Sequence, residues 1–172
     1  MRYSKPRNAG MVGTVLAGLL VTMPAFAFED CHDEEWMTFE GWENWRAITE
    51  KPVISYAHGE NWVGIYANDI AAQTYRDAGP SYEECAAIVK ALYTDIDGSA
   101  VRKLTIMVKM PAGYDPDNGD WWYGDSESTG SGILSGGRRE DCMSCHEVAR
   151  ETDYVFPDDV METVREWSEW RE

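Results

Sequence analysis

The sequence has 172 residues, of which 44% are hydrophobic and 27% are charged, and its formal net charge is −16. This length fits one domain and excludes a multidomain architecture. The acidic excess repels phosphate backbones and anionic lipids, so the composition excludes nucleic-acid binding and favours a basic protein partner.

The first 27 residues have the layout of a secretory signal peptide. Three basic residues lie among the first seven, an apolar run of 13 residues spans 11–23, and a small-x-small cleavage site lies at 25–27. We expect 1–27 to be cleaved and 28–172 to form one exported, periplasmic domain; an uncleaved anchor is the alternative. Cleavage removes three of the 15 basic residues and none of the 31 acidic ones, which leaves a net charge of −19.

The N-terminal half of the exported part predicts a helix, a strand and a second helix. Large apolar residues recur through 34–49 at positions 36, 39, 42, 45 and 48, which is compatible with a helix that buries one aromatic face. Residues 61–67 alternate like a strand. Asn68 is a suitable N-cap for a short helix over 69–77.

Two further strands are predicted over 86–94 and 101–110. The Asp97-Gly98 turn between them favours an antiparallel hairpin. In the second strand of this pair, Leu104, Ile106, Val108 and Met110 share one face.

The C-terminal part predicts a short aromatic strand and two helical segments. Residues 121–123 form the strand, and the Gly- and Ser-rich stretch 124–137 is expected to be a loop. Helices are expected around 142–151 and 158–171. The predicted fold class is therefore α+β, a mainly antiparallel sheet with flanking N- and C-terminal helices.

Cys142-Met143-Ser144-Cys145-His146 is the C-x-x-C-H attachment sequence of haem c. Two thiols on one helical turn can each add to a vinyl group of the same porphyrin, and the adjacent histidine can ligate the iron. The alternatives are a plain disulfide, a thioredoxin-like redox pair or half of a zinc site. Covalent attachment takes place outside the cytoplasm, in agreement with the signal peptide, so we expect one haem, held by Cys142 and Cys145, with His146 on its iron.

Cys31 and Cys85 remain once the haem has taken its two thiols. Because thiols oxidise outside the cytoplasm, we expect an intramolecular disulfide between them. Two free buried thiols or an intermolecular bridge are the alternatives.

Lys90 is an unusual residue within its predicted strand. Alternation places it between Ile88 and Leu92 on one face. Either this face is solvated and the amine reaches the edge, or Lys90 points into a cofactor pocket.

The sequence also resembles the cytochrome P-460 family, which includes the cytochromes c′-beta. The resemblance runs from about residue 40 to 156, and the last three of its matching pieces are the most specific. The matching pieces are 45–49, 55–59, 65–68, 87–90, 107–109, 113–123, 142–146 and 152–156.

This resemblance implies a mainly antiparallel β fold, usually dimeric, with one c-type haem at the sheet and His146 as its proximal ligand. In cytochromes P-460 a lysine is bonded to a meso carbon of the porphyrin, and the matching position is Lys90. Those proteins oxidise hydroxylamine to nitric oxide or nitrous oxide. The cytochromes c′-beta lack the cross-link and bind nitric oxide in an apolar distal pocket.

The sequence departs from the hydroxylamine-oxidising members at several positions. Val63 stands where they carry an arginine, and Ala91 follows Lys90 where many relatives have glutamate. Glu140 and Asp141 lie near the place of a distal carboxylate found in some members. Dehydrogenation of hydroxylamine needs a proton acceptor, so these differences weigh against the enzyme.

Three functions follow from these observations. The first is oxidation of hydroxylamine, with electrons passed to a basic soluble cytochrome, and the second is non-enzymatic binding of nitric oxide. The third is simple electron transfer with Met107, Met110 or His58 as sixth ligand. His58 is otherwise expected to be a surface or structural histidine, and Arg138 and Arg139 are expected either to pair with the haem propionates or to be solvated.

Overall fold

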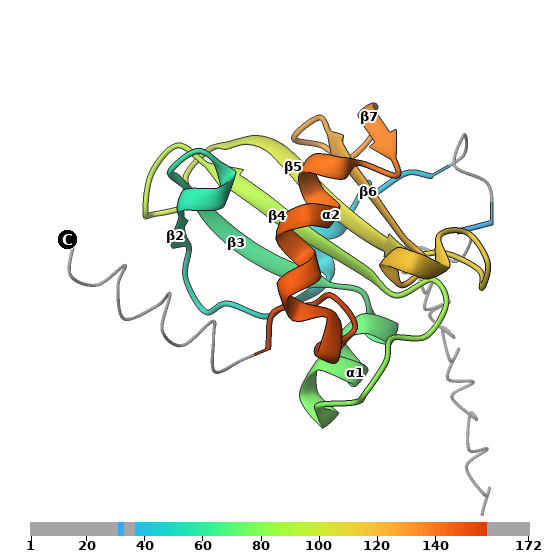
Figure 1. Ribbon diagram of the computed structural model, residues 1–172. Coiled ribbons are helices and arrows are strands. Elements are labelled where there is room, and N and C mark those ends of the chain that lie inside the picture. The colour runs from blue at the N-terminus through green and yellow to red at the C-terminus, as the bar shows by residue number, and fades with distance from the viewer. Residues whose placement is uncertain (1–30, 33–36, 158–172) are drawn as a thin grey trace, which may run out of the picture.

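A seven-stranded antiparallel sheet forms the body of the protein in the computed structural model, which describes residues 31–32 and 37–157 (Figure 1). The strand order is β1-β3-β4-β5-β6-β7, and β2 also pairs with β3. The bounds are β1 Arg46–Ala47, β2 Val53–Ser55, β3 Asn61–Ala67, β4 Ala87–Tyr93, β5 Val101–Lys109, β6 Trp121–Ser126 and β7 Ile133–Gly137. The predicted α+β class and the β4–β5 hairpin are confirmed.

The described part of the chain contains two α-helices beside the sheet. Helix α1 (Asp69–Asp77) has the predicted bounds, and the Asn68 side chain caps it by accepting a hydrogen bond from the Ala71 amide. Helix α2 (Glu140–His146) continues into the 3₁₀ helix η5 (Glu147–Thr152), and both cross in front of the sheet (Figure 1). The predicted signal peptide over 1–27 and the helix predicted around 158–171 lie outside the described residues.

Further 3₁₀ turns connect the strands. They are η2 (Trp42–Asn44), η3 (Tyr56–His58) and η4 (Pro116–Asn118). In the part of the chain that the structure describes, no helix combines the length and apolar character needed to cross a membrane.

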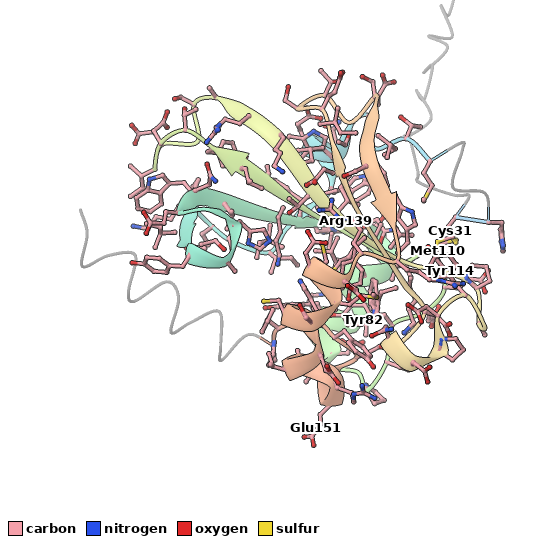
Figure 2. The ribbon with its side chains drawn as sticks, turned by 45° about the horizontal axis from the view of Figure 1, so that its top comes forward. Cys31, Tyr82, Met110, Tyr114, Arg139 and Glu151 are labelled. Atoms are coloured by element: carbon pink, nitrogen blue, oxygen red, sulfur yellow. A yellow bond between two sulfur atoms is a disulfide. The ribbon has the colours of Figure 1, made fainter. Side chains whose placement is uncertain are left out.

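The two faces of the sheet bury different clusters of side chains. One face, called here the pocket face, carries Ile65, Ile88, Leu92, Met107 and Tyr123. The opposite face carries Val89, Leu104, Ile106, Val108 and Trp122. Met110, Tyr114 and Cys31 belong to the cluster on this opposite face, and they lie near one another in Figure 2. The alternation predicted for β4 and β5 is therefore confirmed.

The predicted helix over 34–49 is wrong for the residues described. From residue 37 onward this segment holds only η2 and β1. Gly41 adopts a left-handed conformation with φ of 81°, and the backbone bonds to a remote loop: Phe39 N–H donates to Gly130 O at 2.9 Å. The indole of Trp42 donates to Ser128 O at 3.1 Å. The aromatic residues thus pack on the sheet from an irregular segment.

The predicted loop over 124–137 is also wrong, since β6 continues to Ser126 and β7 pairs with it. Gly124 and Gly136 face each other in this pair. A Cβ atom at either glycine would overlap the ring of Trp122, so these glycines make room for an indole within the sheet. The predicted strand at 121–123 is confirmed as the first half of β6.

The predicted disulfide joins Cys31 to Cys85, two residues before β4 begins. It fastens the N-terminal segment to the opposite face of the sheet, where Cys31 is completely buried.

Replacing both cysteines with serine is expected to lower the free energy of unfolding by about 4 kcal/mol, because the bridge closes a long loop in the unfolded chain. Urea denaturation of the purified protein measures this change. Arg46→Gln, which breaks an exposed ion pair with Asp69, is the control and should cost about 0.5 kcal/mol or less. Equal stability of the double-serine variant and the parent would contradict a bridge in solution.

Candidate functional site

A cavity of about 620 Å³ lies between the pocket face of the sheet and α2. The strand register builds its floor: Lys90 pairs with Ile65 on one side and with Thr105 on the other, and Thr105 pairs with Asp125. These four side chains form one row across β3, β4, β5 and β6, and all line the cavity. Three further walls are α2, residues 53–58 and Phe156.

The two cysteines and the histidine of the C-x-x-C-H motif all line this cavity. Cys142 is half-buried, Cys145 is exposed, and neither is in a disulfide within the described residues. Their spacing of three on α2 places both thiols on the same side of the helix. The motif and Lys90 therefore meet in one place although Lys90 and Cys142 are 52 positions apart in the sequence.

His146 is buried and held in one orientation. Its Nδ1 lies 2.7 Å from the carbonyl oxygen of Tyr154, and because a carbonyl can only accept, Nδ1 carries the proton. Burial, followed by the nearby Lys90, lowers the pKa of His146 to about 4. The ring is therefore neutral at pH 7, and its Nε2 retains the lone pair that a metal ligand needs.

Lys90 lies on the pocket face, so the interpretation of a solvated face is not supported. Its Nζ is 5.9 Å from the ring centroid of Phe156, and no described carboxylate is within ion-pair distance of it. Burial lowers the pKa of Lys90 to about 8, although the thiols of Cys145 and Cys142 act in the opposite direction. About a tenth of this amine is thus unprotonated at pH 7, and an amine must be unprotonated to act as a nucleophile.

Charged residues gather at one end of the cavity, around Asp125. This carboxylate accepts hydrogen bonds from Lys103 Nζ at 3.1 Å and Arg139 Nη1 at 2.7 Å, and Arg139 also pairs with Asp141 at 2.6 Å. Burial raises the pKa of Asp125, but the hydrogen bonds from Arg139 and Lys103 outweigh it, and the net pKa is lowered. The side chain is therefore ionised at neutral pH.

His58 also lines the cavity. Its Nδ1 is 2.7 Å from Ser55 Oγ, and burial, then Lys90, lowers its pKa to about 3. It is neutral at pH 7.

The other predicted candidates divide between the two faces. Met107 and Val63 line the cavity, whereas Met110 and Ala91 belong to the cluster on the opposite face. A sixth-ligand role for Met110 is therefore incompatible with this sheet.

Of the residues just before the motif, some line the cavity and others point elsewhere. Asp141 lines the cavity and Glu140 is exposed. Arg139 reaches the cavity, while the guanidinium of Arg138 stacks 4.8 Å from the ring centroid of Tyr114.

Two buried hydroxyls have no hydrogen-bond partner within the described residues. They are Thr105 Oγ1 and Tyr123 Oη, and both residues line the cavity. Unpaired buried hydroxyls are costly, so their position in the wall fits a cavity that holds a bound group. With two thiols, a neutral imidazole and a mainly apolar lining, the residues present fit haem c.

Sequence reasoning missed several cavity residues, among them Thr105, Tyr123, Asp125 and Lys103. Alternation along β5 could have predicted Thr105 and Lys103, because both lie on the same face of the strand as Met107. Asp125 was hidden in a segment expected to be a loop.

A comparison with family models matches residues 39–157 to the family described as Cytochrome P460. The match covers more than half of the chain. A comparison with curated proteins returns no match.

Asp125→Asn is expected to lower the free energy of unfolding by about 1 to 2 kcal/mol at pH 7, because Lys103 and Arg139 lose their shared anion. The pKa of Asp125 is lowered in the folded protein, so its contribution is present above the ordinary aspartate pKa of about 4 and is lost as the pH falls below it. Urea denaturation at pH 7 and at acidic pH measures both effects. Asp69→Asn, at a side chain that is 89% exposed, is the control. If the free energies of unfolding of Asp125→Asn and the parent differed more at acidic pH than at pH 7, this assignment would be contradicted.

Proposed function

The chain belongs to the cytochrome P460 family, a family of haem-binding c-type cytochromes, and we propose that it is an exported monohaem cytochrome that oxidises hydroxylamine. In this proposal Cys142 and Cys145 attach the haem covalently, His146 is the proximal ligand, and Lys90 lies on the distal side or at the ring edge. The observation that carries the proposal is the shared cavity of Lys90 and the attachment motif.

The site residues have the properties that such a cofactor needs. The two thiols lie on one side of α2, burial keeps His146 neutral, and the hydrogen bond to the Tyr154 carbonyl holds its ring in one orientation. When bound, the haem supplies a redox-active iron with a coordination position open to small nitrogen compounds. Attachment of this kind takes place outside the cytoplasm, which agrees with the proposed signal peptide.

Lys90 is proposed to bond to the porphyrin edge. In the haem-loaded protein this bond would join Lys90 Nζ to a ring carbon and replace one N–H and one C–H hydrogen, and the two protons and two electrons would pass to a two-electron oxidant such as a peroxide. The lowered pKa of Lys90 favours this chemistry, since the attacking amine must be neutral.

Oxidation of hydroxylamine to nitric oxide releases three protons and three electrons. Two cavity residues, His58 and Asp125, can accept protons at neutral pH, because His58 is neutral and Asp125 is ionised. Both have a lowered pKa and are therefore weak bases. We propose that the electrons pass to a basic soluble cytochrome, which the net charge of −19 left after cleavage of residues 1–27 attracts.

Non-enzymatic binding of nitric oxide is the second candidate function. It is favoured by Val63, which occupies the cavity wall where the hydroxylamine-oxidising relatives carry arginine. An apolar wall suits a small neutral ligand and gives hydroxylamine fewer hydrogen bonds.

Lys90→Arg is expected to change the absorption spectrum of the reduced, matured protein. The parent should show a strongly red-shifted Soret band, and the variant should show an ordinary high-spin haem c spectrum, because arginine does not form the bond. Lys103→Arg changes the other lysine of the described cavity wall and should leave the red shift intact. An ordinary spectrum in the parent would exclude the cross-link and favour nitric oxide binding; a sharp six-coordinate spectrum would favour simple electron transfer.

Hydroxylamine is expected to reduce an electron acceptor in the presence of the parent protein, with nitric oxide or nitrous oxide as product. Replacing His58 by Gln or Asp125 by Asn should slow turnover at least about ten-fold, since a general base commonly contributes about 10²-fold or more. Nitric oxide binding, measured by the spectral change on titration, should persist in both variants. A parent that binds nitric oxide without reducing the acceptor would contradict the enzyme and support the second function.

A further inference from the structure

Two consecutive residues after η5 adopt left-handed backbone conformations although neither is glycine. Asp153 has φ of 52° and Tyr154 has φ of 64°. Such conformations are unfavourable for residues with a Cβ atom and persist only where surrounding contacts hold them. The carbonyl that meets His146 Nδ1 belongs to the second of these residues.

The Asp153 side chain is held by a nearly buried ion pair. Lys109 Nζ lies 2.6 Å and 2.7 Å from its two carboxylate oxygens, and the side chains are only 14% and 9% exposed. The Tyr82 amide also donates to this carboxylate at 2.7 Å. Each carboxylate oxygen therefore has a partner in the interior.

The backbone of the same turn is fixed by Trp121. The indole Nε1–H donates to the Asp153 carbonyl at 2.9 Å, and Lys109 Nζ lies 5.1 Å from the centroid of the Trp121 ring. Lys109 ends β5 and Trp121 begins β6, and the two are paired in the sheet. The turn is thus attached to a rigid part of the fold.

Tyr154 is held from the other side. Its hydroxyl donates to Asp117 O at 3.0 Å, and its ring lies over Gly119, where a Cβ atom would overlap the ring. Asp153 and Tyr154 are therefore clamped between β5, β6 and the 115–120 turn.

We infer that the Lys109–Asp153 ion pair is a positioning device that sets the hydrogen bond from His146 to the Tyr154 carbonyl, and thereby the electron donation of the proximal imidazole to the iron. This inference rests on the proposed role of His146 as iron ligand. A carbonyl that accepts from Nδ1–H increases the basicity of Nε2 and favours the ferric state. Lys109 and Asp153 touch neither haem nor substrate in this scheme and act through the backbone.

Lys109→Met in the haem-loaded protein tests the inference. The unpaired Asp153 should leave its position, and the hydrogen bond to His146 should weaken. We expect the iron–histidine stretching band of the ferrous protein, measured by resonance Raman spectroscopy, to move to lower frequency and the reduction potential to rise. Lys109→Arg, which retains the charge, should keep both values closer to those of the parent than Lys109→Met does.

Val108→Ala is the matched control. Val108 precedes Lys109 on β5 but is buried in the cluster on the opposite face, so its truncation destabilises the sheet without touching the turn. It should leave the band and the potential unchanged. If Lys109→Met fails to fold, Gly119→Ala displaces the Tyr154 ring instead and should shift both values in the same directions.

His146→Ala separates the two possible failures. If the band persists in that variant, His146 is not the ligand and the proposed site fails. If the band is lost there but Lys109→Met and Gly119→Ala leave frequency and potential unchanged, the site stands and the positioning role is overturned.

Discussion

The site depends on the two-residue alternation of side chains along β4. This strand lies between β3 and β5, and alternation sends Ile88, Lys90 and Leu92 to the pocket face and Val89 and Ala91 to the opposite core. A shift of the register by one residue would bury Lys90 in the opposite core and remove it from the cavity. Six cross-strand pairs with β3 and seven with β5 fix that register.

The alternating and capped segments could be predicted from the sequence, because local pattern determines them. The bounds of β3 and α1 agree with prediction. Once β4 is predicted as a strand, alternation places Lys90 on the same face as Ile88 and Leu92. The segment around Trp42 could not be predicted this way. Its aromatic spacing resembles a helix, but hydrogen bonds to residues 128 and 130, far away in the sequence, determine its path.

The polar end of the cavity was not predictable for a related reason. Gly124 and Gly136 suggest a loop when only local propensity is considered, yet both are needed beside the ring of Trp122. Once that segment is a strand, Asp125 lies in the same row as Lys90 and Thr105. The attachment motif needed no such context, since its chemistry depends on residue types and spacing alone.

The sheet also separates the four cysteines into two pairs. Cys31 and Cys85 belong to the cluster on one face, and Cys142 packs against the cluster on the other. Four thiols allow three pairings, and an oxidising compartment does not by itself choose among them. Because β4 and β5 lie between the two pairs, the folded sheet excludes a bridge from Cys31 or Cys85 to either of the helical thiols. Oxidation of Cys31 and Cys85 to a disulfide in the folded protein therefore does not consume the thiols of Cys142 and Cys145.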